Sequence, residues 1–333
     1  MNSTHDPTQS RNTRVDSRSQ PWPESNHLLS MPPTSPILDL PALPTTPLVS
    51  VVIPTQNRPR LLKDALASLV GQTYRNWEAI VVNDGGEDVQ HVIAEIGNDP
   101  RIRLLTHWRK LGQSCARNTA LRVAQGQIIC FLDDDDRYLP THIEGIVITM
   151  RQSPDPFIFT GAVKISEQLT KELRIELGRA DIEDSLQTPQ DRLLVWNFIP
   201  LPTWAHRKEC LNQVGFFDEG MTSHEDWDFL LRFAQIWTLR HVNQNTVEIR
   251  IRPTSNDGVT TRNEALKLRD FHFIYDRYPT SSRKIKSLRR EVLAELGERR
   301  AFGAIHLAFR KLMNVYNRNI GWRFHTRSEA KRS

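Results

Sequence analysis

Four consecutive aspartates, Asp133 to Asp136, directly follow the apolar run 128–132. Carboxylates two residues apart can converge on a hard divalent cation, which prefers oxygen ligands and leaves positions for water or substrate phosphates. A cation held in this way would neutralise a diphosphate and make it a better leaving group. On its own, such a run is also typical of an acidic turn exposed to water. Four adjacent carboxylates repel one another, however, and their place after a buried strand favours a ligand site.

Three other polar clusters have the composition of ligand or catalytic sites. Asp84 ends an apolar run, where it could accept a hydrogen bond from a base or a ribose, and the glycines after it would let a ligand approach. Arg117 lies near the start of a predicted helix, a position that suits an anionic ligand. Asp226 precedes Trp227, and partial desolvation by the indole could raise the basicity of the carboxylate, as a general base needs. Taken singly, the three clusters are also typical of a turn, a capped helix and an acidic first helical turn.

Alternating apolar and helical patterns along residues 49–132 predict the elements that position these side chains. Apolar runs typical of buried strands lie at 49–53, 79–82, 101–105 and 128–132, and helical patterns lie at 61–69, 87–96 and 114–124. This alternation predicts a parallel sheet covered by helices on both faces. Ligands bind such sheets at the carboxyl ends of the strands, where residues 54–58, Asp84 and the four aspartates lie. Beyond residue 150 we expect strands near 157–163, 198–206 and 247–252, and helices near 209–214, 225–234 and within 262–320.

Composition divides the chain into three parts. Residues 1–47 hold nine of the 20 prolines and show no apolar periodicity, so a disordered leader is expected there. The main domain is expected over 48–255, and a basic, mainly helical extension over 256–333. From Arg283 to Ser333 there are 14 Lys or Arg against four Glu, which favours contact with an anionic membrane surface rather than with nucleic acid. A solvated helical surface is the alternative, and removal of this tail should leave the main domain folded.

The cysteines and the apolar stretches bear on location. The three cysteines form no CxxC pair and no Cys/His zinc pattern, which favours a reducing compartment. No run of ~18 apolar residues is present, and the sequence begins without an apolar signal region. We therefore expect a cytoplasmic protein, peripheral at the inner face of the membrane where its tail binds there.

In combination and in order, these motifs resemble the pattern of glycosyltransferase family 2, whose members have the GT-A fold, a Rossmann-like, mostly parallel sheet flanked by helices. The resemblance extends from about Val49 to Gln235 and rests on the segments Ile53-Pro54-Thr55-Gln56-Asn57-Arg58, Gln72-Thr73-Tyr74, Asn83-Asp84-Gly85, Ala116-Arg117-Asn118, Phe131-Leu132-Asp133-Asp134-Asp135-Asp136, Phe217-Asp218-Glu219 and Glu225-Asp226-Trp227-Asp228. It implies an inverting, non-processive transferase that uses Mn²⁺ or Mg²⁺. The donor would be a UDP-, GDP- or dTDP-sugar, with a UDP-sugar favoured, and the acceptor a saccharide or another hydroxyl compound.

The resemblance also assigns roles to particular residues. Asp133 and Asp135 would be the outer members of the Asp-x-Asp motif and hold the metal. Asp226 would be the catalytic base, with Glu225 and Asp228 as its rivals. Donor binding would involve eight residues: Pro54, Thr55, Asn57, Arg58, Asp84, Arg117, Asp133 and Asp134.

The sequence departs from the family pattern at four points. Gln56 stands where tyrosine is common, so base stacking would differ, and Asn83 replaces the first Asp of Asp-Asp-Gly. The Gln-x-x-Arg-Trp signature is absent, which argues against a polymerising enzyme. The usual His near the metal is absent from Arg250-Ile251-Arg252-Pro253, so an arginine would hold the diphosphate instead. A nucleotidyltransferase on a similar sheet and a non-catalytic nucleotide-sugar-binding or scaffold protein are the alternatives, and the sequence names neither the sugar nor the acceptor.

Overall fold

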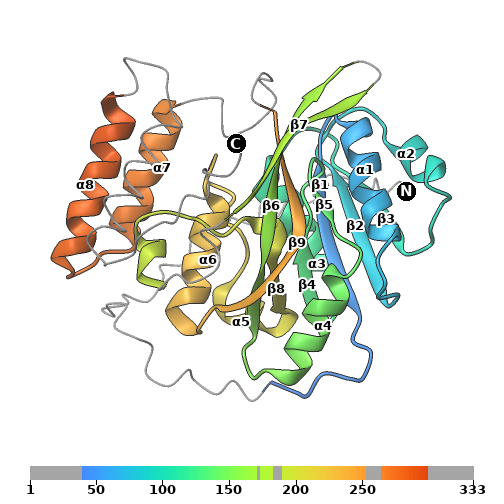
Figure 1. Cartoon of the computed structure of the whole chain (residues 1–333), viewed down its shortest axis with the longest axis horizontal. Coiled ribbons are helices and arrows are strands. Elements are labelled where there is room, and N and C mark those ends of the chain that lie inside the picture. The colour runs from blue at the N-terminus through green and yellow to red at the C-terminus, as the bar shows by residue number, and fades with distance from the viewer. Residues whose placement is uncertain (1–39, 171–172, 183–189, 253–263, 299–333) are drawn as a thin grey trace, which may run out of the picture.

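The computed structural model describes residues 40–170, 173–182, 190–252 and 264–298, which form a mixed sheet flanked by helices (Figure 1). Nine strands follow the order β3-β2-β1-β4-β8-β6-β9-β5, with β7 paired to β6. The strands are β1 (Val49–Thr55), β2 (Trp77–Asn83), β3 (Ile102–Thr106), β4 (Ile128–Phe131), β5 (Arg137–Tyr138), β6 (Phe157–Leu169), β7 (Arg174–Asp181), β8 (Trp204–Arg207) and β9 (Arg240–Ile251). The α-helices are α1 (Pro59–Val70), α2 (Gln90–Glu95), α3 (Gln113–Val123), α4 (His142–Gln152), α5 (Leu211–Val214), α6 (Glu225–Ile236), α7 (Glu264–Arg277) and α8 (Arg283–Glu298).

The first half of the sheet is parallel, as its continuous apolar strands predict. β1 pairs in parallel with β2 and β4, and β2 pairs in parallel with β3. All seven residues of β1 are buried, since helices cover both faces of the sheet. The carboxyl ends of β1, β2 and β4 therefore lie at one edge, and they bring residues 54–58, Asp84 and the four aspartates to the same place.

The second half of the sheet is mixed. β8 lies antiparallel between β4 and β6, and β6 is parallel to β9. The short β5, directly after the aspartates, pairs with β9, so β9 ends beside the acidic run. β6 continues into a hairpin with β7, whose side chains are exposed except for the partly buried Arg174.

Two apolar clusters pack against opposite faces of the sheet. One contains side chains of α1, α2 and α4, and the other contains side chains of α3, α6, α7 and α8. β1 supplies both, because successive side chains of a strand point to opposite faces: Val51 and Ile53 belong to the first cluster and Val52 to the second. Figure 1 shows α2 and β3 at one end of the molecule and α8 at the other.

Helix α8 is part of the core, which corrects the expectation that residues 283–333 could be removed without unfolding the rest. Leu288 and Val292 are 6% and 2% exposed and belong to the cluster that includes α6. The guanidinium of Arg289 donates to the backbone carbonyls of Leu194 (2.7 Å) and Tyr278 (2.7 Å). Because α8 shares the core, its removal should destabilise the main domain; residues 299–333 lie outside the described part of the chain.

The last residues of the expected leader contact the main domain. Residues 1–39 are outside the described part, but Arg207 donates to the carbonyl of Pro41 (2.8 Å), and Tyr74 donates to that of Pro47 (2.6 Å). Among the described helices, none has both the length and the apolar character needed to cross a membrane.

Candidate active site

The acidic run after β4 alternates between accessible and buried side chains. Asp133 and Asp135 have 29% and 20% of their side-chain surface exposed. Asp134 and Asp136 are only 4% and 5% exposed. The outer members of the predicted Asp-x-Asp motif are therefore the two that a ligand can reach.

The two buried aspartates join the run to neighbouring elements. Asp134 accepts hydrogen bonds from the Thr55 hydroxyl (2.8 Å) and the Arg58 guanidinium (3.1 Å), and Asp136 accepts one from the backbone N–H of Arg250 (2.8 Å). Burial raises the pKa of Asp134 to about 7, although Arg58 opposes the shift. Burial also raises the pKa of Asp136 well above its ordinary value. Asp134, predicted to bind the donor, thus has protein partners on both of its oxygens.

Arginines face the two accessible aspartates. Arg117 donates to Asp133 Oδ1 (2.9 Å), and Asp135 contacts both Arg58 (3.3 Å) and Arg252. Arg252 directly follows β9, and its side chain is 5% exposed. Guanidinium groups bind phosphate oxygens well, so arginine side chains suited to bind a diphosphate lie next to the carboxylates.

Asp133 and Asp135 fit a divalent cation that is bound together with its substrate. Such cations are commonly held by one or two carboxylates, with substrate phosphates and water in the other positions. Two accessible carboxylates two residues apart supply that set. Across the described ranges, no group of three or more His, Cys, Asp or Glu side chains is arranged to hold a metal ion.

The end of β1 contributes contacts in two directions. Thr55 and Arg58 reach the acidic run, as described above, and Pro54 is buried beneath them in the strand. Asn57 has a left-handed backbone (φ 54°), and its Oδ1 accepts the backbone N–H of Glu87 (2.8 Å). The structure thus brings Thr55 and Arg58 to the aspartates and places Asn57 against the loop after β2.

Asp84 holds the loop between β3 and α3. Its carboxylate accepts the backbone N–H groups of Leu111 and Gly112, both at 2.8 Å, and Oδ1 lies 2.8 Å from His107 Nδ1. Asp84 is 5% exposed, so in this structure its carboxylate serves mainly these protein partners. The amide of Gln56 donates to the Asp84 carbonyl (3.0 Å), which joins the ends of β1 and β2.

The two glycines after Asp84 lie close to two different loops. Gly85 has a positive φ of 65°, and a Cβ there would lie 2.1 Å from the backbone carbon of Arg109. A Cβ on Gly86 would lie 2.8 Å from the backbone nitrogen of Asn57. The close approach that these glycines permit in this structure is that of the protein's own backbone.

Asp226 lies in the first turn of α6. Its Oδ1 accepts the backbone N–H of Trp227 (2.8 Å), and its Oδ2 accepts the amide of Asn197 (3.0 Å). Burial raises the pKa of Asp226 to about 7, and the negative charge of Glu225 adds to the shift while Arg117 opposes it. A carboxylate with such a pKa can take up a proton near neutral pH.

The sequence neighbours of Asp226 are hydrogen-bonded to, or paired with, other residues. Glu225 is 7% exposed and accepts the Arg117 guanidinium at 2.6 Å. Asp228 is fully buried, where it pairs with Arg232 (3.0 Å) and accepts the Tyr278 hydroxyl (2.8 Å). Trp227 is buried too, and its indole N–H donates to the carbonyl of Leu193 (2.7 Å), which anchors the start of α6. Of the three acidic residues, Asp226 is the one that is half-buried rather than buried.

Arg117 connects the two halves of the site. It is 3% exposed, and it donates to Asp133 after β4 and to Glu225 in α6. Burial alone would lower its pKa, but the charges of Asp133 and Glu225 raise it above the ordinary value. The next residue, Asn118, exchanges two hydrogen bonds of 2.9 Å with the backbone of Phe217. The Ala-Arg-Asn and Phe-Asp-Glu segments are thus in direct contact.

Asn197 is a site residue that the sequence did not indicate. Its amide donates to Asp226, and its own Oδ1 accepts the backbone N–H of Ile199 (3.1 Å). The second contact fixes which end of the amide faces Asp226. A lone Asn in an irregular segment carries no pattern that would single it out.

The sequence profile described as "Glycosyl transferase family 2" matches residues 50–208. The chain is 30% identical over 200 residues to "Uncharacterized glycosyltransferase YwdF" of Bacillus subtilis, a match that covers 58% of this chain and 70% of the relative. It is 29% identical over 230 residues to "Putative colanic acid biosynthesis glycosyl transferase WcaA" of Escherichia coli, covering 64% and 78%. A shorter match, 35% identical over 112 residues, is to "UDP-Glc:alpha-D-GlcNAc-diphosphoundecaprenol beta-1,3-glucosyltransferase WfgD" of E. coli, covering 34% of this chain and 44% of that protein.

Two solved structures have a similar fold. S. aureus TarS 1-349 in complex with UDP-GlcNAc gives a TM-score of 0.55 at 17% identity, covering 75% of this chain and 72% of TarS 1-349. The mannosyltransferase PcManGT of Pyrobaculum calidifontis, in complex with GDP-Man and Mn²⁺, gives 0.53 at 16% identity, covering 85% and 83%. At these identities the likeness shows the shared architecture.

Proposed function

The chain belongs to glycosyltransferase family 2, and from this premise we propose that it moves a sugar from a nucleotide-sugar donor to a hydroxyl acceptor by metal-assisted single displacement with inversion. The observation that carries the proposal is the position of Asp226. It is the half-buried member of an acidic trio, burial raises its pKa to about 7, and its neighbour Glu225 is joined to the acidic run through Arg117.

On this proposal, the donor binds along the carboxyl edge of β1, β2 and β4. Asp133 and Asp135 would hold Mn²⁺ or Mg²⁺, and when bound the cation neutralises charge on the departing diphosphate. Arg58 and Arg252 flank Asp135 and would bind diphosphate oxygens. We propose a UDP-sugar as donor because TarS was crystallised with UDP-GlcNAc and the name of WfgD specifies UDP-Glc.

The chemical step would be carried by Asp226. As the acceptor oxygen attacks the anomeric carbon, Asp226 takes its proton, and the bond from that carbon to the diphosphate oxygen breaks on the opposite face. Asn197 would orient the carboxylate, since it donates to Oδ2 while the Trp227 N–H holds Oδ1. The result is a glycoside of inverted configuration and a free nucleoside diphosphate.

A panel of nucleotide sugars, tested by thermal shift with and without Mn²⁺, identifies the donor, because a ligand that binds only the folded state raises its apparent stability. Release of nucleoside diphosphate in the presence of candidate acceptors then tests turnover. We expect a Mn²⁺-dependent shift with one donor and release with that donor. Binding without any turnover would instead favour a nucleotide-sugar-binding role, and no binding to any donor would contradict the proposal.

Asn197→Ala should lower kcat by about tenfold, the rate equivalent of roughly 1.4 kcal/mol of lost hydrogen bonding and orientation. Donor affinity should stay unchanged. Loss of the amide donor also disfavours the ionised carboxylate, so the rising limb of the pH–rate profile should move to higher pH. Asn212→Ala, at an exposed position of α5, is the matched control. A pH profile identical to that of the unmodified protein would show that Asn197 does not act on Asp226.

We further propose that the basic C-terminal region contacts an anionic membrane at the cytoplasmic face. Arg283, Lys286 and Arg290 are exposed on α8, whereas its apolar residues Ile285, Leu288 and Val292 are buried in the core. Contact through α8 would therefore be electrostatic, without insertion of its apolar face.

Vesicles of phosphatidylglycerol and phosphatidylcholine test this proposal by co-sedimentation. Each basic residue near such a surface contributes about 1 kcal/mol, so reversing all three to Glu should weaken binding at least tenfold at low salt. Truncation after Glu298 should also weaken binding. Lys63→Glu should not, since Lys63 belongs to α1, and α1 and α8 lie toward opposite ends of the molecule (Figure 1). Equal sedimentation of all four proteins would contradict the proposal.

A further inference from the structure

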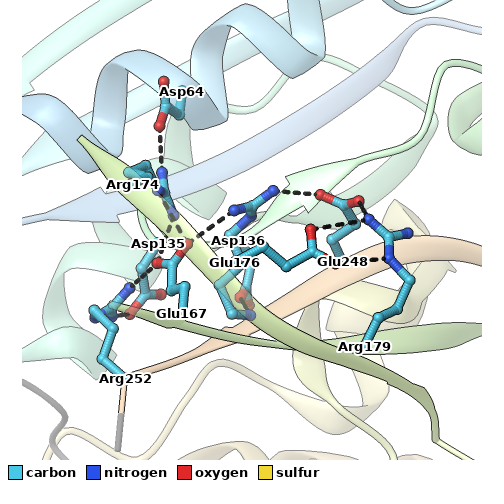
Figure 2. Close-up of polar contacts among 10 residues, drawn as sticks. Asp64, Asp135, Asp136, Glu167, Arg174, Glu176, Arg179, Glu248 and Arg252 are labelled. Atoms are coloured by element: carbon cyan, nitrogen blue, oxygen red, sulfur yellow. Dashed lines mark hydrogen bonds and ion pairs between the residues drawn. The ribbon is translucent and has the colours of Figure 1, made fainter. Parts of the chain in front are cut away.

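Glu167, a buried carboxylate on β6, accepts hydrogen bonds from three arginines near the acidic run. Glu167 is 1% exposed. Its Oε1 accepts hydrogen bonds from Arg174 (2.7 Å) and Arg252 (3.2 Å), and its Oε2 accepts them from Arg174 (3.1 Å) and Arg250 (2.8 Å). Figure 2 shows Glu167 between Arg174 and Arg252, with Asp135 beside Arg252. All four lone-pair sites of the carboxylate are therefore in use.

The three arginines extend from Glu167 to different elements. Arg252 reaches Asp135, the backbone N–H of Arg250 reaches Asp136, and Arg174 reaches Asp64 on α1. A buried charge is costly unless it is paired and hydrogen-bonded, and here each charge has partners on more than one side. Burial alone would raise the pKa of Glu167, but the hydrogen bonds from Arg174 and Arg250 hold it below its ordinary value.

Arg252 uses different nitrogens for its two carboxylates. One guanidinium nitrogen donates to Glu167 and the other to Asp135. Once Asp135 takes part in binding a cation and the donor, the second nitrogen can exchange the carboxylate for a diphosphate oxygen, while the first stays on Glu167. The planar fork of arginine makes this division possible, which the single ammonium group of lysine would not.

We propose that Glu167 is a positioning residue for the donor diphosphate, because it holds Arg252 where its guanidinium reaches the phosphates beside Asp135. This inference rests on the proposed function. It states that donor affinity depends on Glu167 and that Glu167 acts through Arg252.

Glu248 offers a matched control on the neighbouring strand. It is 7% exposed and accepts hydrogen bonds from Arg250 (2.6 Å) and Arg179 (3.0 Å). It is thus a buried glutamate in the same network (Figure 2), where it pairs with Arg179 and Arg250. Changing Glu248 to Gln alters the same chemical group with the same loss of charge.

The experiment measures UDP binding by calorimetry, with and without Mn²⁺, for the full chain and four variants. Glu167→Gln should weaken UDP about tenfold, and Arg252→Ala should weaken it at least as much. The double variant should bind no more weakly than Arg252→Ala alone, because coupled residues are not additive. Glu248→Gln should stay within about twofold of the unmodified protein.

Thermal unfolding shows whether each variant is folded, and Glu167→Asp, which keeps the charge and shortens its reach, should give an intermediate affinity. If Glu167→Gln does not fold, the inference is decided by Glu167→Asp and Arg252→Lys, both of which should weaken UDP. Unchanged affinity in the folded variants, or additive effects in the double variant, would overturn the inference.

The failure of this inference can be told apart from failure of the proposed function. If the unmodified protein releases nucleoside diphosphate but Glu167 variants bind UDP normally, only the positioning role is wrong. If the unmodified protein neither binds UDP nor turns over any nucleotide sugar, the proposed function is wrong and the inference is wrong with it.

Discussion

Replacing Asp226 with Asn should reduce sugar transfer by about 10²–10⁴-fold, the usual contribution of a positioned general base, and leave donor affinity nearly unchanged. An acceptor hydroxyl is too weakly acidic to ionise near neutral pH, so a carboxylate must take its proton as the new bond forms. Asn keeps the size of the side chain but cannot accept that proton. In the unmodified protein kcat/KM should rise with pH and level off above about pH 7, where Asp226 is ionised. A product assay and calorimetry with the donor measure the two effects separately.

Three other variants sharpen the test of Asp226. Asp84→Ala should weaken donor binding itself, because Asp84 holds the β3–α3 loop at the donor edge. Glu225→Gln and Asp228→Asn should differ from Asp226→Asn, since their carboxylates are paired with Arg117 and Arg232. Turnover at the normal rate in Asp226→Asn would place the base elsewhere. Donor binding lost as fully as activity would assign Asp226 to the donor site.

Asp135→Asn should lower transfer by orders of magnitude, and a chelator should stop the unmodified enzyme until Mn²⁺ or Mg²⁺ is restored. The substitution keeps the shape of the side chain but removes the charge of one of two accessible carboxylates in the acidic run. Hard divalent cations depend on such charged oxygen ligands. Nucleoside diphosphate release, followed as a function of metal concentration, measures the effect.

A surface carboxylate provides the control for Asp135. Asp155 lies before β6 and pairs with the half-exposed Arg240 at 3.2 Å, so Asp155→Asn removes one charge far from the acidic run and should leave the metal requirement unaltered. Full activity in chelator, with the protein shown to be free of metal, would contradict the assignment of Asp133 and Asp135.

The sequence predicted the elements whose environment is uniform. β1, β2 and β4 are short apolar runs buried on both sides, so their composition identifies them. β3 was also predicted from an apolar run, although only Ile102 is buried in it. β7 was missed because its side chains alternate charged and apolar residues on an exposed hairpin. The direction of β8 was also beyond prediction, since an antiparallel insertion between β4 and β6 depends on connections that leave no local pattern.

The candidate site likewise contains residues that the sequence identified and contacts that it could not reveal. The four aspartates could be found because they follow a buried strand in sequence. Contacts between distant parts of the chain could not be found from the sequence, since Asn197 and Asp226 are 29 residues apart and Glu167 and Arg252 are 85 residues apart. The glycines after Asp84 were recognised as close-approach residues, but Gly85 approaches the backbone of Arg109 and Gly86 that of Asn57, and only the folded chain shows this.

The raised pKa of Asp226 also affects the balance between folding and activity. Its carboxyl has an ordinary pKa of 3.8 and a pKa of about 7 in the folded protein. Between those values the folded protein binds more protons than the unfolded chain, so the contribution of this group to the free energy of unfolding falls as the pH rises. Below about pH 4 the group is neutral in both states, and above about pH 7 the folded protein bears the whole cost of burying the charge. The ionised form is also the one that can accept a proton. At the pH where Asp226 can act as a base, its buried charge therefore lowers the free energy of unfolding, a trade-off between stability and activity that is common at catalytic sites.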